Sequence, residues 1–228
     1  MSEQLDPSAQ AVLDAMREAD LPPLETMPAP QARQAFRDRR GRRELKLLPI
    51  AGVEDRLVDT GATQVPVRIY RPEAEEPRPV IVYFHGGGWV VGDLDTHDTL
   101  CRVLTASSGM GVVAVDYPLS PEHGFPADFN AAWSAYRNAV AEWGDGPVVL
   151  CGDSAGGNLA AAVAHHSREA GVTPAGQVLI YAGLGGDRSL PSYREHANAP
   201  QLTVADIEFY RQIRTGGTVV RGDPRIAP

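Results

Sequence analysis

The stretch "VVLCGDSAGGNLAAAVAHH", Val148 to His166, joins an apolar run to an alanine-rich run through a short turn that contains glycine. The apolar run predicts a strand that ends at Gly152, and the alanine-rich run predicts a helix from Ala155 to Glu169. Between them Gly152, Ser154 and Gly156 form the pattern G-x-S-x-G. The stretch therefore predicts a sharp strand-to-helix turn that presents a serine at the end of a sheet.

A serine at such a turn is typical of nucleophilic catalysis, because a base and a substrate carbonyl both reach its hydroxyl there. The glycines two residues before and two residues after the serine relieve the crowding of the turn. The N–H of Ala155 opens the predicted helix and points to where a reacting oxygen would carry negative charge. The pattern alone also fits a glycine-rich turn without any chemistry. The strand before it and the helix after it favour a nucleophile.

A second glycine-rich stretch, "FHGGGWVVGD" from Phe84 to Asp93, follows another apolar run. Glycine contributes no side chain to a core and costs backbone entropy, so three in a row indicate that the backbone itself has a role. A tetrahedral oxyanion needs two or three N–H donors, and backbone donors approach it only where no Cβ intervenes. We therefore predict that Gly87 and Gly88 donate to the same oxyanion as Ala155, opposite Ser154.

Strands alternate with helices on both sides of these two stretches. Two short runs, "EDRLVD" and "VPVRIYRP", predict a hairpin. Most of the later apolar runs are followed by a helical segment, which is the pattern of an α/β fold with a mostly parallel sheet and helices on both faces. The expected elements are strands at 79–85, 112–117, 147–152 and 176–181 and helices at 96–107, 127–143, 155–169 and 204–213.

The composition is that of a soluble protein. The chain has 228 residues, is 43% hydrophobic and carries a formal net charge of -8, which argues against binding to nucleic acid. The basic stretch from Arg33 to Lys46 is expected to be a solvated helix face, with an anionic ligand or an acidic partner as the alternative. We see no signal peptide, no membrane-spanning run and no disulfide or metal pattern in the two cysteines. A cytoplasmic protein is therefore expected.

Three motifs, "HGGGW", "DYPLSPEHGFPA" and "GDSAGGNLA", resemble the hormone-sensitive-lipase-like branch of the α/β-hydrolases, the bacterial class IV esterases. The resemblance implies an α/β-hydrolase fold with a helical cap and with its strands, numbered along the chain, in the order 1-2-4-3-5-6-7-8. It implies a small-molecule ester with a short or medium acyl chain as substrate, and no metal or cofactor. Ser154 would be the nucleophile, with an oxyanion hole formed by Gly87, Gly88 and Ala155. We call the turn from Gly152 to Gly156 the elbow and the stretch from Phe84 to Asp93 the glycine loop. Five residues would shape them: His85, Gly86, Gly152, Asp153 and Gly156.

The resemblance also divides the chain. Residues 1–46 are expected to be N-terminal cap helices, 47–182 the hydrolase core, 183–216 a second cap segment and 217–228 a link toward the family's seventh strand. The family places its catalytic Asp after the seventh strand and its catalytic His after the eighth. Neither segment has a counterpart in this sequence. We therefore expect the last two strands and the catalytic Asp and His to be absent from this chain.

The chain's own histidines are not expected to replace that base. His165 and His166 follow Ser154 by 11 and 12 residues on one predicted helix, which places them roughly 16–18 Å away. A structural position in a proline-rich loop is expected for His123. His97 is expected to be solvated at the start of a helix, and His196 is expected to be solvated in a loop.

Three hypotheses follow. The chain belongs to an ester hydrolase and is impaired as it stands, or it is a non-catalytic acyl-ligand binding protein of the same fold, or it is a remnant without function. The second has a precedent in plant hormone receptors of this family, which do not turn over their ligand. Without a seventh strand, residues 177–181 would form an apolar edge of the sheet. Such an edge predicts self-association or binding of a separate C-terminal piece.

Overall fold

The computed structural model describes residues 5–19, 22–41, 47–59, 64–73, 79–143, 146–218 and 220–228. Within them the chain forms one mixed sheet of six strands in the order β1-β2-β4-β3-β5-β6. This is the strand order that the family resemblance implies for the first six strands. The strands are β1 (Gly52–Asp59), β2 (Gln64–Arg71), β3 (Val80–Phe84), β4 (Gly111–Val115), β5 (Val148–Asp153) and β6 (Gly176–Ile180).

The hairpin and the parallel part of the sheet agree with the sequence pattern. β1 and β2 pair antiparallel, as predicted, while the turn between them lies outside the described residues. β3 pairs parallel with both β4 and β5, and β5 pairs parallel with β6. Every residue of β3 is buried, because a strand at the centre of the sheet is covered on both faces.

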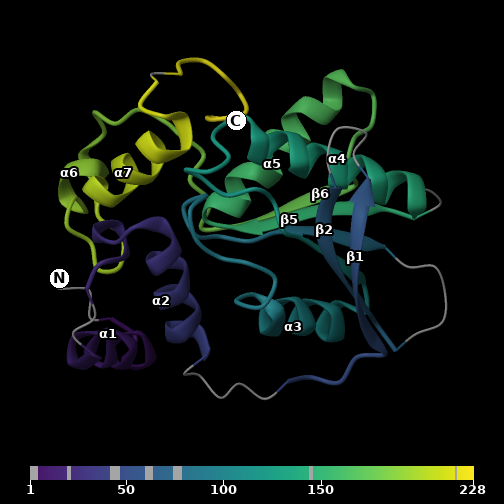
Figure 1. The fold of residues 1–228 in the computed structure, drawn as a ribbon, viewed down its shortest axis with the longest axis horizontal. Coiled ribbons are helices and arrows are strands. Elements are labelled where there is room, and N and C mark those ends of the chain that lie inside the picture. Colours follow the sequence, from purple (N-terminus) through teal and green to yellow (C-terminus); the bar gives the residue numbers. More distant parts are fainter. Residues whose placement is uncertain are drawn as a thin grey trace.

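The helices that follow the strands cover both faces of the sheet (Figure 1). α4 (Ala127–Glu142) and α5 (Ala155–Glu169) lie on one face, over a core that includes Phe84, Tyr136 and Leu159. α3 (Asp98–Ser108) lies on the other face, over a smaller core around Tyr83 and Cys101. These three helices lie within about two residues of their predicted bounds, so the α/β class and its layering are confirmed.

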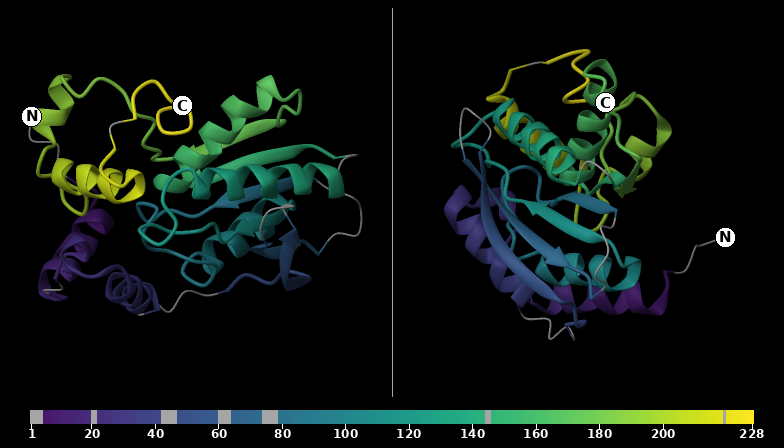
Figure 2. Two further views of the ribbon diagram at one scale, coloured as in Figure 1. Left: turned by 45° about the horizontal axis from the view of Figure 1, so that its top comes forward. Right: turned by 90° about the vertical axis from the view of Figure 1, so that its right-hand side faces the viewer.

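The remaining helices gather at one end of the sheet (Figure 2). They are α1 (Pro7–Ala19), the short 3-10 helix η1 (Leu24–Thr26), α2 (Ala29–Gly41), α6 (Pro191–Glu195) and α7 (Val204–Thr215). α2 and α7 pack against the loop that leaves β3, where Ala32, Val90 and Val91 are buried together. This arrangement supports the division into cap and core segments, which remains a prediction. No helix among the described residues has the length and apolarity needed to cross a membrane.

β6 is the last strand of the sheet within the described residues. Only one of its sides pairs with a neighbouring strand, β5. The side chain of Val178 is half exposed, at 50%, whereas the paired residue Cys151 on β5 is buried. The prediction of an edge at this position is therefore confirmed, and what would bind to it remains a prediction.

Candidate active site

The predicted nucleophile lies at a strained turn between β5 and α5. Ser154 follows the last residue of the strand and precedes Ala155, the first residue of the helix. Its backbone has φ 51° and ψ -115°, a combination that non-glycine residues rarely adopt. The N–H of Ser154 donates to the carbonyl of Ile180 at 2.9 Å, which ties the turn to the end of β6. The serine is partly exposed at the end of the sheet, as the pattern predicts.

The two glycines of the pattern are required by close backbone contacts. A Cβ on Gly152 would lie 2.4 Å from the carbonyl carbon and oxygen of Gly156. A Cβ on Gly156 would lie 2.0 Å from the carbonyl oxygen of Phe84, at the end of β3. Both distances are far below van der Waals contact. The turn therefore packs directly on the end of the neighbouring strand, with space for hydrogen atoms only.

The glycine loop after β3 faces this turn because β3 and β5 are parallel neighbours. The register pairs Phe84 with Gly152, so β3 and β5 have their C-terminal ends side by side. In the loop Gly87 has φ 124° and Gly88 has φ 61°, conformations that favour glycine. The carbonyl of Gly87 accepts hydrogen bonds from the N–H groups of Val90 and Val91, at 3.1 and 3.0 Å. These bonds close the loop into a tight turn.

The predicted oxyanion donors, two in the glycine loop and one at the start of α5, make no other hydrogen bond among the described residues. Within the described residues, the N–H groups of Gly87, Gly88 and Ala155 donate no hydrogen bond to another part of the chain. Free backbone N–H groups at the ends of two adjacent strands, one set beside a helix N-terminus, form an arrangement suited to an anionic oxygen. The structure thus brings the predicted donor residues to the C-terminal ends of β3 and β5, where Ser154 lies.

Asp153 joins the two halves of the site. Its carboxylate accepts a hydrogen bond from the N–H of Gly86 at 2.8 Å and another from the hydroxyl of Tyr83, and it lies 3.7 Å from Nε2 of His97. Burial alone would raise the pKa of Asp153, but the nearby His97 and the hydrogen bonds from Tyr83 and Gly86 outweigh it and lower that pKa. Asp153 is therefore a buried carboxylate that holds the glycine loop against the elbow.

His85 and His97 pack together behind the loop. The ring of His85 stacks on Tyr117 with centroids 4.3 Å apart, and its Nδ1 lies 2.9 Å from the carbonyl oxygen of Gly86. Burial, and then the neighbouring His97, lower the pKa of His85 to about 4. This environment fits the structural role expected for His85. The expectation that His97 lies at the surface is wrong: it does precede α3, but its side chain is buried against Asp153 and His85.

The other histidines lie apart from the serine or in solvent. His166 packs edge-on against Phe129 and Trp133, on the α4 side of α5. Three others are exposed: His123, His165 and His196. Within the described residues the hydroxyl of Ser154 makes no hydrogen bond, so no general base is engaged with it there.

The basic stretch is only partly a solvated face. Arg33 donates to the carbonyl oxygens of Val90 and Ser120 at 2.8 and 2.9 Å, and it pairs with Glu122. Arg37 pairs with Asp93 at 2.5 Å. Arg33 is largely covered by these loops, with 19% of its side chain exposed, whereas Arg37 reaches Asp93 but still has 47% of its side chain in solvent. Residues 42–46 of the stretch lie outside the described residues.

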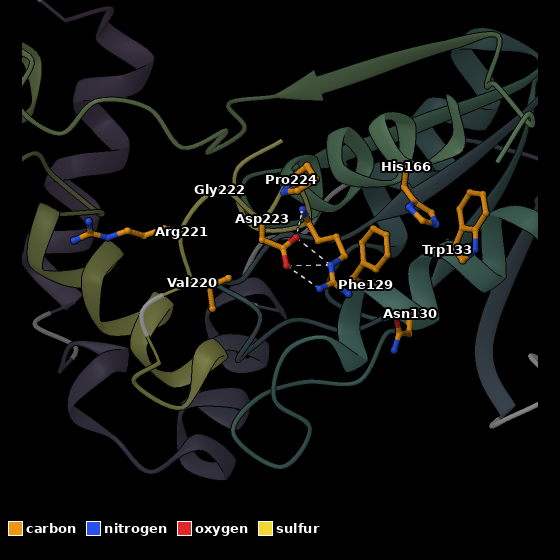
Figure 3. Close-up of a pocket in the computed structure, with 10 residues that line it drawn as sticks. Phe129, Asn130, Trp133, His166, Val220, Arg221, Gly222, Asp223 and Pro224 are labelled. Carbon is orange, nitrogen blue, oxygen red and sulfur yellow. Dashed lines mark hydrogen bonds and ion pairs between the residues drawn. The ribbon is translucent and has the colours of Figure 1, made fainter. Parts of the chain in front are cut away.

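One hollow lies beside the glycine loop and another lies beside α4 and α5. The smaller, a cavity of about 210 Å³, is apolar and lies between η1, α2, α7 and the glycine loop; it is lined by Leu24, Met27, Ala32, Val90, Val91, Phe209, Tyr210 and Ile213, among others. The larger, of about 600 Å³, is an open depression between the ends of α4 and α5 and the segment from Val220 to Arg225 (Figure 3). Ser154 is not among the described residues that line either hollow.

Comparison with known proteins agrees with this architecture. A model of the α/β-hydrolase fold family matches residues 81–228. The carboxylesterase NlhH of Mycobacterium tuberculosis is 44% identical over 165 residues, which is 69% of this chain and 52% of that protein. The ethyl acetate hydrolase of Pseudomonas putida is 33% identical over 225 residues, which is 90% of this chain and 68% of that protein.

A solved structure shows the same relation. The ester-hydrolase EH1AB1 from the metagenome of Lake Arreo, solved with a bipyridine phosphonate derivative, superposes with a TM-score of 0.91 at 32% identity. The match covers 99% of this chain and 75% of that one. The chain spans about half the length of the mycobacterial relatives that it matches. By family model, sequence identity and fold, the chain belongs to the α/β-hydrolase family, in its hormone-sensitive-lipase-like esterase branch.

Proposed function

We propose that these residues form the nucleophile and the oxyanion hole of a carboxylic ester hydrolase. The hydroxyl oxygen of Ser154 attacks the ester carbonyl, and its proton passes to a base. The carbonyl oxygen becomes negatively charged and is stabilised by the N–H groups of Gly87, Gly88 and Ala155. The alcohol then leaves with a proton, and water releases the acid from the acyl-serine. The supporting observation is a strained serine that faces a glycine loop with free N–H groups.

The substrate class is proposed to be an ester with a short or medium acyl chain. The apolar cavity of about 210 Å³ beside the glycine loop supports this, because the described residues that line it are uncharged and its volume is small. The names of the relatives, which include a carboxylesterase and an ethyl acetate hydrolase, agree with it.

The activity of the 228 residues alone is expected to be low. A serine hydroxyl without a base is a weak nucleophile at neutral pH. Binding and an oxyanion hole alone still give about 10³–10⁴-fold catalysis over water. We therefore expect slow turnover of a p-nitrophenyl ester by these residues alone, changed little by Ser154→Ala.

The experiment compares these 228 residues with the longest product of the gene. In the longer product Ser154→Ala should lower turnover of p-nitrophenyl butyrate by about 10⁴-fold or more, while Ser192→Ala, at an exposed position of α6, should not. If the 228 residues turn over esters at the same rate as the longer product and lose this with Ser154→Ala, a base lies within them. Ester binding without any Ser154-dependent turnover in either form would favour the binding protein instead.

A further inference from the structure

α7 carries two side chains that face consecutive residues of the glycine loop. The helix begins at a capping box formed by Thr203 and Asp206 and ends before Gly216, so its position in the chain is well fixed. Tyr210 and Arg214 are four residues apart and therefore lie on the same side of it. No motif in the sequence marks either residue. Their importance follows from what they contact.

The ring of Tyr210 lies on Gly88. A Cβ on Gly88 would come within 2.5 Å of two atoms of that ring. Gly88 has φ 61°, and its N–H is one of the donors that we assign to the oxyanion. The ring therefore covers the outer side of this residue and leaves space for a glycine only. The contact with Gly88 is made by carbon atoms of the ring. Burial raises the pKa of Tyr210 to about 12.

The guanidinium of Arg214 lies on Trp89, the next residue of the loop. Its central carbon is 4.2 Å from the centroid of a Trp89 ring, a cation–π arrangement. Trp89 has φ 60°, which is unusual for a residue with a side chain, and such a conformation persists only when its surroundings enforce it. Two consecutive left-handed residues of the loop are thus each covered by one side chain of α7.

Arg214 also reaches the helix that carries the nucleophile. Its Nε donates to Asp128 of α4 at 2.6 Å, and its Nη1 donates to the side-chain oxygen of Asn158 on α5 at 3.3 Å. Asn158 lies one turn after Ser154 and donates its backbone N–H to the Ser154 carbonyl at 3.1 Å. Arg214 as a whole is 1% exposed. One buried cation therefore contacts the loop on one side and the nucleophile helix on the other.

We propose that Tyr210 and Arg214 are positioning residues that hold Gly88 and Trp89 in their left-handed conformation. Arg214 in addition sets the spacing between the two halves of the oxyanion hole, the glycine loop and the N-terminus of α5. The catalytic meaning of this clamp rests on the function proposed above, whereas its effect on the loop backbone does not.

The chemistry of Arg214 favours this role over simple docking of the helix. A buried ion pair carries a desolvation cost that an apolar side chain of similar size would avoid, so docking alone does not require it. A planar guanidinium with five donors is the group that stacks on an aromatic ring and still reaches a carboxylate and an amide. Lysine keeps the charge beside Asp128 but loses the plane and the second donor direction.

The first test reads the loop directly and needs no activity. Amide proton–nitrogen spectra would be recorded for Arg214→Lys and Tyr210→Ala, with Arg211→Lys as the control on the same helix. We expect the amide signals of the glycine loop and the indole signal of Trp89 to move in both test variants and to stay in place in the control. If these signals do not move, the clamp is wrong, even if the ester hydrolase is confirmed.

The second test measures ester turnover in the longest product of the gene. Misplacing a catalytic group by about 1 Å costs up to about 10²-fold in rate, so Arg214→Lys and Tyr210→Ala should lower kcat by about 10- to 100-fold. KM should change by less than about 3-fold in Arg214→Lys, since ground-state binding does not use the oxyanion donors. Tyr210 also lines the apolar cavity, so this expectation for KM applies to Arg214→Lys alone. Tyr210→Phe, which keeps the ring, should restore the rate.

Equal loss in Tyr210→Phe and Tyr210→Ala would overturn the ring contact as the cause. A rise in KM without a fall in kcat would also overturn the proposal, because it would indicate a role in binding. Thermal melts of every variant show whether it is folded. If Tyr210→Ala does not fold, the comparison between Arg214→Lys and Arg211→Lys decides.

Discussion

β5 and β6 are adjacent parallel strands of one sheet, yet their surroundings are opposite. Where β5 ends, Gly152 and Gly156 have no space for a methyl group, and the carboxylate of Asp153 is buried among hydrogen-bond donors. On β6, a Cβ at Gly176 would meet no atom of the described residues within 4 Å, and Val178 is half exposed. Close backbone packing and a buried carboxylate are therefore found where β5 ends, whereas Gly176 and Val178 on β6 have space around them.

Alanine at matched glycines gives the largest expected contrast. Gly156→Ala should destabilise the fold by about 3 kcal/mol or more, because the new Cβ would overlap the carbonyl oxygen of Phe84 and backbone cannot easily yield. Gly176→Ala should change stability by less than about 0.5 kcal/mol. Urea denaturation of both variants measures the difference. Similar unfolding free energies would show that the elbow is looser than the structure indicates.

The glycine loop is the next point of contrast. Gly88→Ala, in the longest product of the gene, should lower ester turnover by about 10²–10³-fold, the scale for losing one oxyanion donor. Substrate binding should change less. Because the new methyl would meet the ring of Tyr210, the same substitution should cost less in a Tyr210→Ala background. Full turnover in Gly88→Ala would mean that the glycine serves the turn alone, and the same change at Gly52, which has open space, is the control.

The third contrast concerns self-association through the edge strand β6. The 228 residues alone are expected to self-associate through β6, because an unpaired apolar strand is a template for another chain. Val178→Lys should shift the population toward monomer in size-exclusion chromatography with light scattering. Leu57→Lys, on exposed β1 at the opposite edge, should not. A monodisperse monomer at all concentrations of the unchanged chain would contradict the edge argument.

The smallest effect is on the pH dependence of stability. The pKa of His85 is lowered to about 4 in the folded protein, against about 6.5 in the unfolded chain. Between these two values the unfolded chain binds a proton at His85 and the folded protein does not. The unfolding free energy therefore falls as the pH falls from about 6.5 to 4. Burial, and then Asp93, raise the pKa of Asp116 to about 6, so its ionisation destabilises the fold as pH rises from about 4 to 6. The two slopes oppose each other in this window.

Asp116→Asn should therefore uncover the slope of His85. Between pH 4 and 6 the unfolding free energy of this variant should rise with pH by up to roughly 1.4 kcal/mol per unit. The unchanged chain should show a flatter profile there. Urea titrations at four pH values measure both. Parallel profiles for the two proteins would show that Asp116 does not titrate as its burial implies.

The sequence predicted the elements that depend on local patterns. The elbow from Val148 to Glu169 was predicted almost to the residue, because a strand, a glycine turn and a helix each have a clear local signal. The glycine loop was predicted for the same reason. The order of the strands followed from the resemblance to the family and agrees with the structure.

Long-range contacts were not predictable in this way. Nothing near His97 in the sequence indicates that it is buried against Asp153, which is 56 residues away. Arg33 was assigned to a solvated face because charge runs normally are, but the fold brings it to Val90 and Glu122. The contacts of Tyr210 and Arg214 with the glycine loop likewise depend on the packing of a late helix on an early loop.

The central claim is that Ser154 forms a covalent acyl intermediate opposite the glycine loop. The most direct measurement is peptide mass mapping of the longest product of the gene. The protein would react with p-nitrophenyl acetate and be quenched rapidly, or would be incubated with an alkyl phosphonate ester. We expect one adduct per chain, located on Ser154, no adduct in Ser154→Ala and slower formation in Gly88→Ala. An adduct on another residue, or ester turnover without any adduct on Ser154, would contradict the account.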